Sequence, residues 1–285
     1  MSTDPEPDRL GEAQLRQWIP TLLDACQHAA DAILDIYQQP DLGIQQKQDL
    51  SPLTLADMAS HRILSEALAA LTPDIPVLSE ESNAITFEQR RQWPRLWVVD
   101  PLDGTREFIK RNDEFTINVA LVEHQQATLG VIAVPVEQTA YVGLAESKQA
   151  FKFDGHRQSQ IIQTRRPCPG KPIVLGSRSH GNPVNEAYFK QLQQSFGQID
   201  RIGAGSALKF CKVAEGSADF YPRFGPTSEW DTAAGHALVE AAGGRVWLAD
   251  GRALRYNARS SLLNRSFLVA GDASIDWPMP PPTAG

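Results

Sequence analysis

Two long helical patterns precede a block of strand patterns, and this order most restricts how the chain can fold. Apolar residues recur at helical spacing from Leu10 to Tyr37, and a second helical pattern follows Thr54. Further strand patterns lie at 96–99, 116–122, 127–134, 140–144, 173–175, 246–248 and 267–269, and further helical patterns at 185–196, 206–215 and 231–242. Helices and strands alternate in groups without internal repeats, which predicts a layered α/β (α+β) architecture.

With 285 residues, the chain is long enough to bury a substantial core without disulfides or structural metals. A polar, Pro-containing stretch at 157–172 is the best candidate boundary, so we expect an N-terminal α+β subdomain at 10–156 and a C-terminal α/β subdomain at 172–276. The three cysteines, Cys26, Cys168 and Cys211, form no CxxC pair. We expect them to be free thiols of a reducing compartment.

A formal net charge of −7 argues against binding to nucleic-acid polymers or anionic membranes, which requires basic patches. A small anionic ligand is still compatible, because a few local cations or bound metal ions can reverse the sign of a cleft. No apolar stretch approaches the roughly 20 residues that span a bilayer. The first seven residues are acidic and contain Pro, unlike a signal peptide, so we expect a cytoplasmic protein.

The segment 100–105, Asp-Pro-Leu-Asp-Gly-Thr, directly follows the strand pattern at 96–99. Asp100 and Asp103 lie on a turn stiffened by Pro101 and can converge on one site, and Mg²⁺ prefers such oxygen ligands. The backbone N–H groups after Gly104 suit a phosphate oxygen. An acidic turn that caps a helix explains the same pattern, and this segment alone leaves the two interpretations balanced.

Three other acidic positions are ambiguous on their own. Asp231 stands at the start of a helical pattern, where an N-cap is the simpler explanation. Glu80 follows an apolar segment at 75–78, where a solvated charge at a strand end is the simpler explanation. Asp57 lies three residues after Thr54, which fits a capping box that opens the second helix.

Together these segments resemble the signatures of the inositol-monophosphatase superfamily. Glu-Glu-Ser at 80–82, the 100–105 segment followed by Phe108, and 230–244 beginning with Trp-Asp occur in the family's order. The resemblance implies a layered αβαβα sandwich and a phosphatase that uses two or three Mg²⁺ ions and is often inhibited by Li⁺. The metal ligands that it implies are Glu80, Asp100, the main-chain carbonyl of Leu102, Asp103 and Asp231.

The resemblance also implies how the reaction proceeds. One ion lowers the pKa of a bound water and orients it for in-line attack, while a second stabilises the leaving oxygen. The family's proton acceptor is an Asp–Thr pair, which maps onto Asp57 and Thr105. No covalent phosphoenzyme is expected.

Three segments favour one branch of this superfamily, the 3′(2′),5′-bisphosphate nucleotidases of the CysQ type. They lie at 47–57, 205–210 and 221–231, and Ser79 before Glu80 points the same way. The resemblance therefore predicts hydrolysis of 3′-phosphoadenosine 5′-phosphate to AMP and phosphate, a reaction of sulfur assimilation.

Such a substrate carries a second phosphate away from the metals, and that phosphate needs cations of its own. Ser206 and Lys209 would share a face if both lie on a helix, and with Arg223 they could clamp this group. Without the resemblance, solvated cations are the simpler explanation of Lys209 and Arg223. The substrate contacts that we expect are Gly104, Thr105, His180, Ser206, Lys209 and Arg223.

Two alternatives stay open at this point. One is an inositol or sugar monophosphate phosphatase of the same superfamily, in which Ser206, Lys209 and Arg223 are incidental. The other is a non-catalytic phosphate-binding regulator on the same fold, which predicts loss of a metal ligand. A homodimer is also open, because family members are often dimers.

Overall fold

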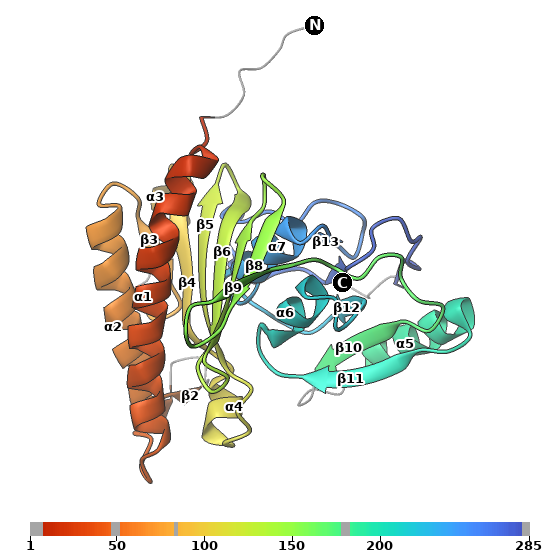
Figure 1. Ribbon diagram of the computed structural model, residues 1–285, viewed down its shortest axis with the longest axis horizontal. Coiled ribbons are helices and arrows are strands. Elements are labelled where there is room, and N and C mark those ends of the chain that lie inside the picture. Colours follow the sequence, from red (N-terminus) through yellow and green to blue (C-terminus); the bar gives the residue numbers. More distant parts are fainter. Residues whose placement is uncertain (1–7, 47–51, 83–84, 178–182, 281–285) are drawn as a thin grey trace, which may run out of the picture.

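The computed structural model describes residues 8–46, 52–82, 85–177 and 183–280. Its helices and two large sheets form five layers (Figure 1), which confirms the αβαβα sandwich expected from the sequence. The helical layers are α1 (Glu12–Tyr37) with α2 (Leu55–Leu71), then α6 (Leu208–Ala214) with α7 (Ala233–Ala241), and finally α5 (Pro183–Phe196). No helix of the described residues is long and apolar enough to cross a membrane.

The larger sheet is a nearly continuous antiparallel meander. Its strands, in spatial order, are β3 (Val77–Ser79), β4 (Arg95–Asp103), β5 (Thr116–Glu123), β6 (Gln126–Val134), β7 (Thr139–Leu144), β8 (Gln149–Phe153) and β9 (Ser159–Ile162). Among the described strands of this sheet, only β3 and β4 pair in parallel. Trp97 and Val99 belong to the core under α1 and α2, whereas Leu96 and Val98 belong to the core that contains α6 and α7. This burial on both faces explains the uninterrupted apolar run.

The smaller sheet closes the other side of the central core. Its spatial order is β11 (Asp200–Ala204), β10 (Ile173–Ser177), β12 (Phe220–Arg223), β14 (Phe267–Ala270) and β13 (Arg245–Leu248). Its outer face packs under α5, where Tyr188, Phe220 and Trp277 are buried together. The Phe220 and Trp277 rings stack with centroids 4.1 Å apart. This core under α5 thus anchors the C-terminal segment that contains Trp277 to the smaller sheet.

Most elements lie close to their predicted positions, and the differences have local causes. The strand predicted at 96–99 continues to Asp103, because Asp103 pairs with Thr116 beyond an irregularity in the ladder. Several strands were not predicted, among them β8, which has a single buried residue, β9, an exposed edge strand inside the 157–172 stretch, β11, which is mostly exposed, and the four-residue β12. The division of the chain into 10–156 and 172–276 stays a prediction.

Helix α7 lies directly against the larger sheet because two strands carry glycine beneath it. A Cβ added at Gly130 would stand 2.2 Å from the carbonyl oxygen of Ala234, and one at Gly143 would stand 2.4 Å from the Cα of Leu238. Both neighbours are helix backbone, which cannot rotate away as a side chain can. The two glycines therefore set the depth of α7 and of the turn that precedes it.

We expect Gly143→Ala to destabilise the protein by about 1–3 kcal/mol, because the added methyl group forces α7 away from the sheet. Denaturant unfolding followed by circular dichroism measures this difference. Gly170→Ala is the matched control, since a Cβ there meets nothing within 4 Å and its φ is not positive. Equal unfolding free energies for the two variants would contradict the close packing of α7.

Candidate active site

The acidic residues predicted at two strand ends meet at one edge of the larger sheet. Because β3 and β4 run parallel, their carboxyl ends lie together, and the Glu80 N–H donates to the Val99 carbonyl at 3.1 Å. Glu80 is half-buried there, and Asp100 on the neighbouring strand is fully buried. The parallel pair thus brings a glutamate and an aspartate to the same place.

The end of β4 is held in an irregular conformation that turns both of its aspartates toward one site. The ladder shifts register between Asp100 and Asp103, a type of bulge that often re-aims side chains beside functional sites. The Leu102 N–H donates to Asp100 Oδ1 at 3.1 Å, and Ser60 Oγ donates to the Pro101 carbonyl at 2.7 Å. These bonds fix the segment between the two carboxylates.

Gly104 ends β4 with a left-handed backbone, and α4 (Thr105–Ile109) begins immediately after it. Its φ is +96°, and an added Cβ would stand 3.2 Å from the Glu114 carbonyl oxygen. Glycine meets both conditions at little cost. The short helix predicted to open after 100–105 is therefore present, with Thr105 as its first residue.

Asp231 completes the acidic group from the opposite side. It was predicted to start a helix, but it ends a short 3₁₀ turn, η1 (Glu229–Asp231), two residues before α7 begins. Its Oδ2 accepts the Ser228 N–H at 2.8 Å. Carboxylate oxygens of Asp100, Asp103 and Asp231, hereafter the aspartate cluster, all lie within 4.8 Å of one another.

The aspartate cluster is electrostatically strained. Burial raises the pKa of Asp100 well above its ordinary value, and the charges of Glu80, Asp103 and Asp231 raise it further. Burial raises the pKa of Asp103 to about 6 against the opposing charge of Lys209, and burial together with Asp103 raises the pKa of Asp231 to about 8. A divalent cation relieves such repulsion and finds hard oxygen ligands here, so the donor set fits a metal such as Mg²⁺.

Asp57 makes two kinds of contact, one with each carboxylate oxygen. Oδ2 accepts from the N–H of Thr54 at 2.7 Å, which is one bond of the predicted capping box of α2, and also from the Thr54 hydroxyl at 2.5 Å. Oδ1 accepts from Thr105 Oγ1 at 3.3 Å. The same hydroxyl lies 3.4 Å from the Leu102 carbonyl oxygen. The cap therefore orients Asp57 toward Thr105 and leaves its second oxygen beside the aspartate cluster.

A hollow of about 140 Å³ opens beside the cluster, hereafter the aspartate hollow. The predicted site residues that line it are Asp103, Gly104, Ser206, Lys209, Arg223 and Asp231. Among the described residues, Ser206 Oγ and Arg223 Nε are buried without a hydrogen-bond partner. Two unmet polar groups in one hollow are what a bound polar ligand would satisfy.

Ser206 and Lys209 reach this hollow differently from the prediction. Ser206 has a φ of +39° and precedes α6, which begins at Leu208, so the expected shared helix face is wrong. Lys209 is buried and its Nζ donates to the carbonyls of Ala204 at 3.1 Å and Ser206 at 2.6 Å. Burial lowers the pKa of Lys209 to about 8, although the charge of Asp103 opposes that shift.

Other residues of this site lie outside the predictions or outside the described structure. His180 and residues 47–51 of the 47–57 motif lie outside the described residues. The predictions missed Asn118, whose Nδ2 donates to Asp103 Oδ2 at 3.2 Å, and Thr227 and Thr232, which line the hollow. Thr116 and Asn118 are polar at alternate positions of an otherwise apolar strand, and that pattern was the available signal for Asn118.

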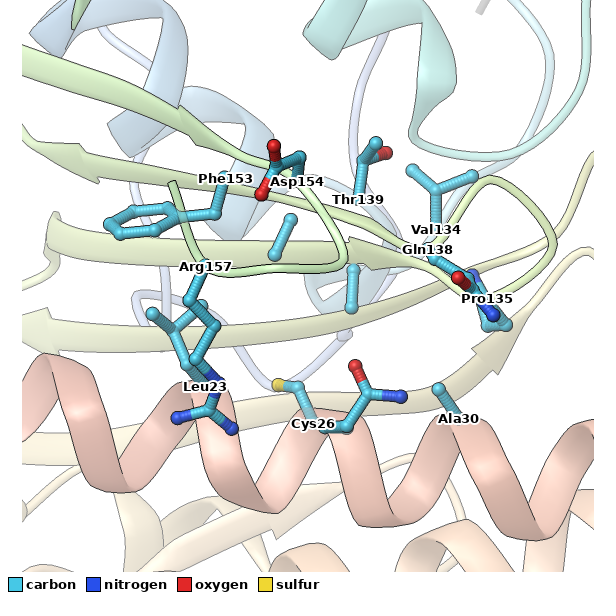
Figure 2. Close-up of a pocket in the computed structure, with 13 residues that line it drawn as sticks. Leu23, Cys26, Ala30, Val134, Pro135, Gln138, Thr139, Phe153, Asp154 and Arg157 are labelled. Carbon is cyan, nitrogen blue, oxygen red and sulfur yellow. The ribbon is translucent and has the colours of Figure 1, made fainter. Parts of the chain in front are cut away.

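A second hollow, between α1 and strands of the larger sheet, has no comparable chemistry (Figure 2). Its cavity of about 30 Å³ has room for a water molecule but not for a metabolite. Figure 2 shows Cys26 on α1 pointing into it, and burial raises the pKa of this thiol to about 12. A protonated, buried thiol is unreactive. Cys26, Cys168 and Cys211 are all free, as predicted.

The layered fold and the acidic site agree with a family model that matches residues 14–275, described as the inositol monophosphatase family. The chain belongs to this family, which confirms the resemblance found in the sequence. Enzymes of the family depend on metal ions, and the aspartate cluster could hold one.

Individual proteins with similar sequences or structures are more specific than the family model. The 3′(2′),5′-bisphosphate nucleotidase CysQ of Salmonella typhimurium is 48% identical over 85% of this chain and 95% of its own length. The protein of the same name from Escherichia coli K12 is 46% identical with the same coverage. The crystal structure of CysQ from Bacteroides thetaiotaomicron superposes with a TM-score of 0.77 at 41% identity, covering 88% of this chain and 96% of that one. An inositol monophosphatase from Zymomonas mobilis gives 0.71 at 25% identity, covering 91% and 94%.

Proposed function

We propose that this protein is a Mg²⁺-dependent 3′(2′),5′-bisphosphate nucleotidase that hydrolyses 3′-phosphoadenosine 5′-phosphate to AMP and phosphate in the cytoplasm. Relatives that are 46–48% identical over 85% of the chain carry that name, which supports the substrate class. The observation that carries the proposal is the pairing of an aspartate cluster with a hollow where Ser206 and Arg223 hold unmet hydrogen-bonding groups.

The proposed metal ligands are Glu80, Asp100, the Leu102 carbonyl, Asp103 and Asp231, for two or three Mg²⁺ ions. Their oxygens are the hard donors that Mg²⁺ prefers, and the mutual repulsion of these buried carboxylates favours a bound cation. A metal ion held there would supply a coordinated water of lowered pKa and would neutralise charge on the phosphate. The aspartates position it, and Asn118 holds Asp103 through the 3.2 Å bond.

Asp57 and Thr105 are the proposed proton acceptors. Thr105 Oγ1 donates to Asp57 Oδ1, so Oγ1 can take a proton from the attacking water while its own proton passes to the Asp57 carboxylate, which ends the step protonated. The bonds from Thr54 keep the Asp57 carboxylate from rotating. The same carboxylate, that of Asp57, therefore caps α2 with one oxygen and faces Thr105 with the other.

The second phosphate of the substrate is the proposed ligand of Ser206 and Arg223. Arg223 donates one N–H to the Pro226 carbonyl at 2.9 Å, and its Nε is among the unmet groups. Lys209 holds the Ala204–Ser206 backbone from behind and adds positive charge to the hollow. This arrangement assigns direct contact to Ser206 and Arg223 and a supporting role to Lys209.

In a panel of phosphate esters with Mg²⁺, we expect 3′-phosphoadenosine 5′-phosphate to be hydrolysed faster than adenosine 3′-phosphate or inositol 1-phosphate. Arg223→Ala should lower kcat/KM for the bisphosphate by about 10- to 100-fold, the equivalent of one charged hydrogen bond, and change that for adenosine 3′-phosphate little. A malachite green assay of released phosphate measures both. A preference for inositol 1-phosphate, or equal losses on both nucleotides, would contradict the proposed substrate.

A further inference from the structure

A buried polar network lies behind η1, the turn that carries Asp231. It joins Arg90 at the end of α3 (Phe87–Arg90), Glu229 in η1, and Asn257 in the loop before β14. Arg90 and Glu229 are each 1% exposed and Asn257 is 5% exposed. Because burying a guanidinium and a carboxylate is costly, such a network calls for a specific reason.

Asn257 connects the two charged residues. Arg90 donates to Asn257 Oδ1 at 2.7 Å, and Asn257 Nδ2 donates back to the Arg90 carbonyl at 2.6 Å. The backbone N–H of Asn257 then donates to Glu229 Oε2 at 2.7 Å. Asparagine tolerates the positive φ of +52° that this geometry requires better than most residues. Three segments distant in sequence are thus tied together at one residue.

Nη2 of Arg90 holds the same loop. It donates to the carbonyls of Arg259 at 2.9 Å and Ser260 at 2.6 Å, and the guanidinium lies over the Phe87 ring with its carbon 4.8 Å from the ring centroid. The loop in turn supports η1, since the Glu229 N–H donates to the Leu262 carbonyl at 2.9 Å. The turn before α7 is therefore anchored by its backbone and by the Glu229 side chain.

We propose that Arg90, Asn257 and Glu229 form a positioning network that fixes Asp231 for metal binding. Glu229 lies two residues before Asp231 in a single 3₁₀ turn, so any movement of its carboxylate rotates the turn and moves the aspartate. In the described part of the chain, none of the three residues lines the aspartate hollow, and the network acts by holding the backbone of η1. Mutation of residues that orient a metal ligand in this way commonly weakens metal affinity by about 10- to 100-fold.

The proposal rests on the metal site of the proposed function, and direct Mn²⁺ binding tests it without any substrate. Asn257→Gly removes both side-chain bonds to Arg90 while glycine keeps the positive φ and the N–H to Glu229. Glu229→Ala removes the anchor of η1 itself. We expect the Mn²⁺ dissociation constant, measured by electron paramagnetic resonance, to rise about tenfold in the first variant and up to about 100-fold in the second.

Tyr188→Phe is the matched control, because it removes a buried side-chain bond to the Pro278 carbonyl in the distant core under α5. It should lower the melting temperature and leave Mn²⁺ affinity unchanged. Saturating Mg²⁺ should restore most of the rate of Asn257→Gly, as expected for a weakened metal site.

The outcomes distinguish failure of the positioning network from failure of the proposed metal site. Folded Asn257→Gly protein with wild-type Mn²⁺ affinity and only a lowered melting temperature would overturn the network's positioning role while leaving the proposed function intact. If Glu229→Ala does not fold, Asn257→Gly decides alone. A wild-type protein that binds no Mn²⁺ would overturn the metal site and, with it, this proposal.

Discussion

Replacing Asp231 with Asn is expected to lower kcat by about a thousandfold or more and to raise the melting temperature of the metal-free protein. The loss follows because metal ions supply several kcal/mol of transition-state stabilisation, and each ~1.4 kcal/mol is a factor of ten. The gain follows because the substitution removes one of three carboxylates whose oxygens lie within 4.8 Å. Asn still offers an oxygen to the Ser228 N–H, so the turn keeps its bond.

The stability effect has a defined pH dependence. Burial and Asp103 raise the pKa of Asp231 from 3.8 to about 8, so the folded state prefers the protonated carboxyl. A raised folded-state pKa stabilises at low pH, and this contribution is lost as pH rises from about 4 to about 8. Metal-free wild type should therefore melt lower at pH 8 than at pH 6, and Asp231→Asn should lose less over that range. At pH 8 with a divalent metal, wild type should instead melt at a higher temperature than Asp231→Asn.

Scanning calorimetry with EDTA and then with Mg²⁺ measures the difference in melting temperature between wild type and Asp231→Asn without and with metal. Asp74→Asn provides a matched change of the same type at an exposed position outside the cluster. An Asp231→Asn protein that retained wild-type kcat, or that melted lower than wild type at pH 8 in EDTA, would contradict the metal-cluster account.

Thr105→Val should lower kcat by about 100- to 10,000-fold, the usual contribution of general acid–base catalysis. Valine preserves the shape of threonine but cannot hold a proton between the water and Asp57 Oδ1. The capping box of α2 uses the other oxygen, Oδ2, so the unfolding free energy should change little.

Thr105→Ser supplies the control, because it keeps the hydroxyl and should retain most of the activity. Steady-state kinetics at saturating Mg²⁺ and substrate compare the variants. If Thr105→Ser loses as much activity as Thr105→Val, keeping the hydroxyl does not preserve the rate and the proposed proton transfer is wrong.

Local sequence patterns were enough to find the family and the strands that carry the acidic residues. The run ending at Asp100 was recognised because both faces of β4 are buried, which removes the polar alternation of a half-exposed strand. Asp57 was read both as a helix cap and as a proton acceptor, and its two oxygens make these contacts separately. The structure confirms the helix cap, whereas the proton-acceptor role of Asp57 stays a prediction.

The sequence did not reveal features that depend on distant partners. Ser206 has a positive φ, which no local pattern indicates, and α6 begins only at Leu208, so the predicted helix began too early. Arg90 and Asn257 are 167 residues apart and look like ordinary surface residues until the fold brings them together. Edge strands such as β9 bury too little to leave a hydrophobic pattern.

Product analysis tests the central claim most directly. Incubation of 3′-phosphoadenosine 5′-phosphate with the protein, followed by ³¹P nuclear magnetic resonance, distinguishes 5′-AMP from adenosine 3′-phosphate and from unchanged substrate. The account predicts 5′-AMP and inorganic phosphate in equal amounts with Mg²⁺, and unchanged substrate with EDTA. Turnover that persists in EDTA, or no turnover of this nucleotide alongside rapid hydrolysis of inositol 1-phosphate, would contradict it.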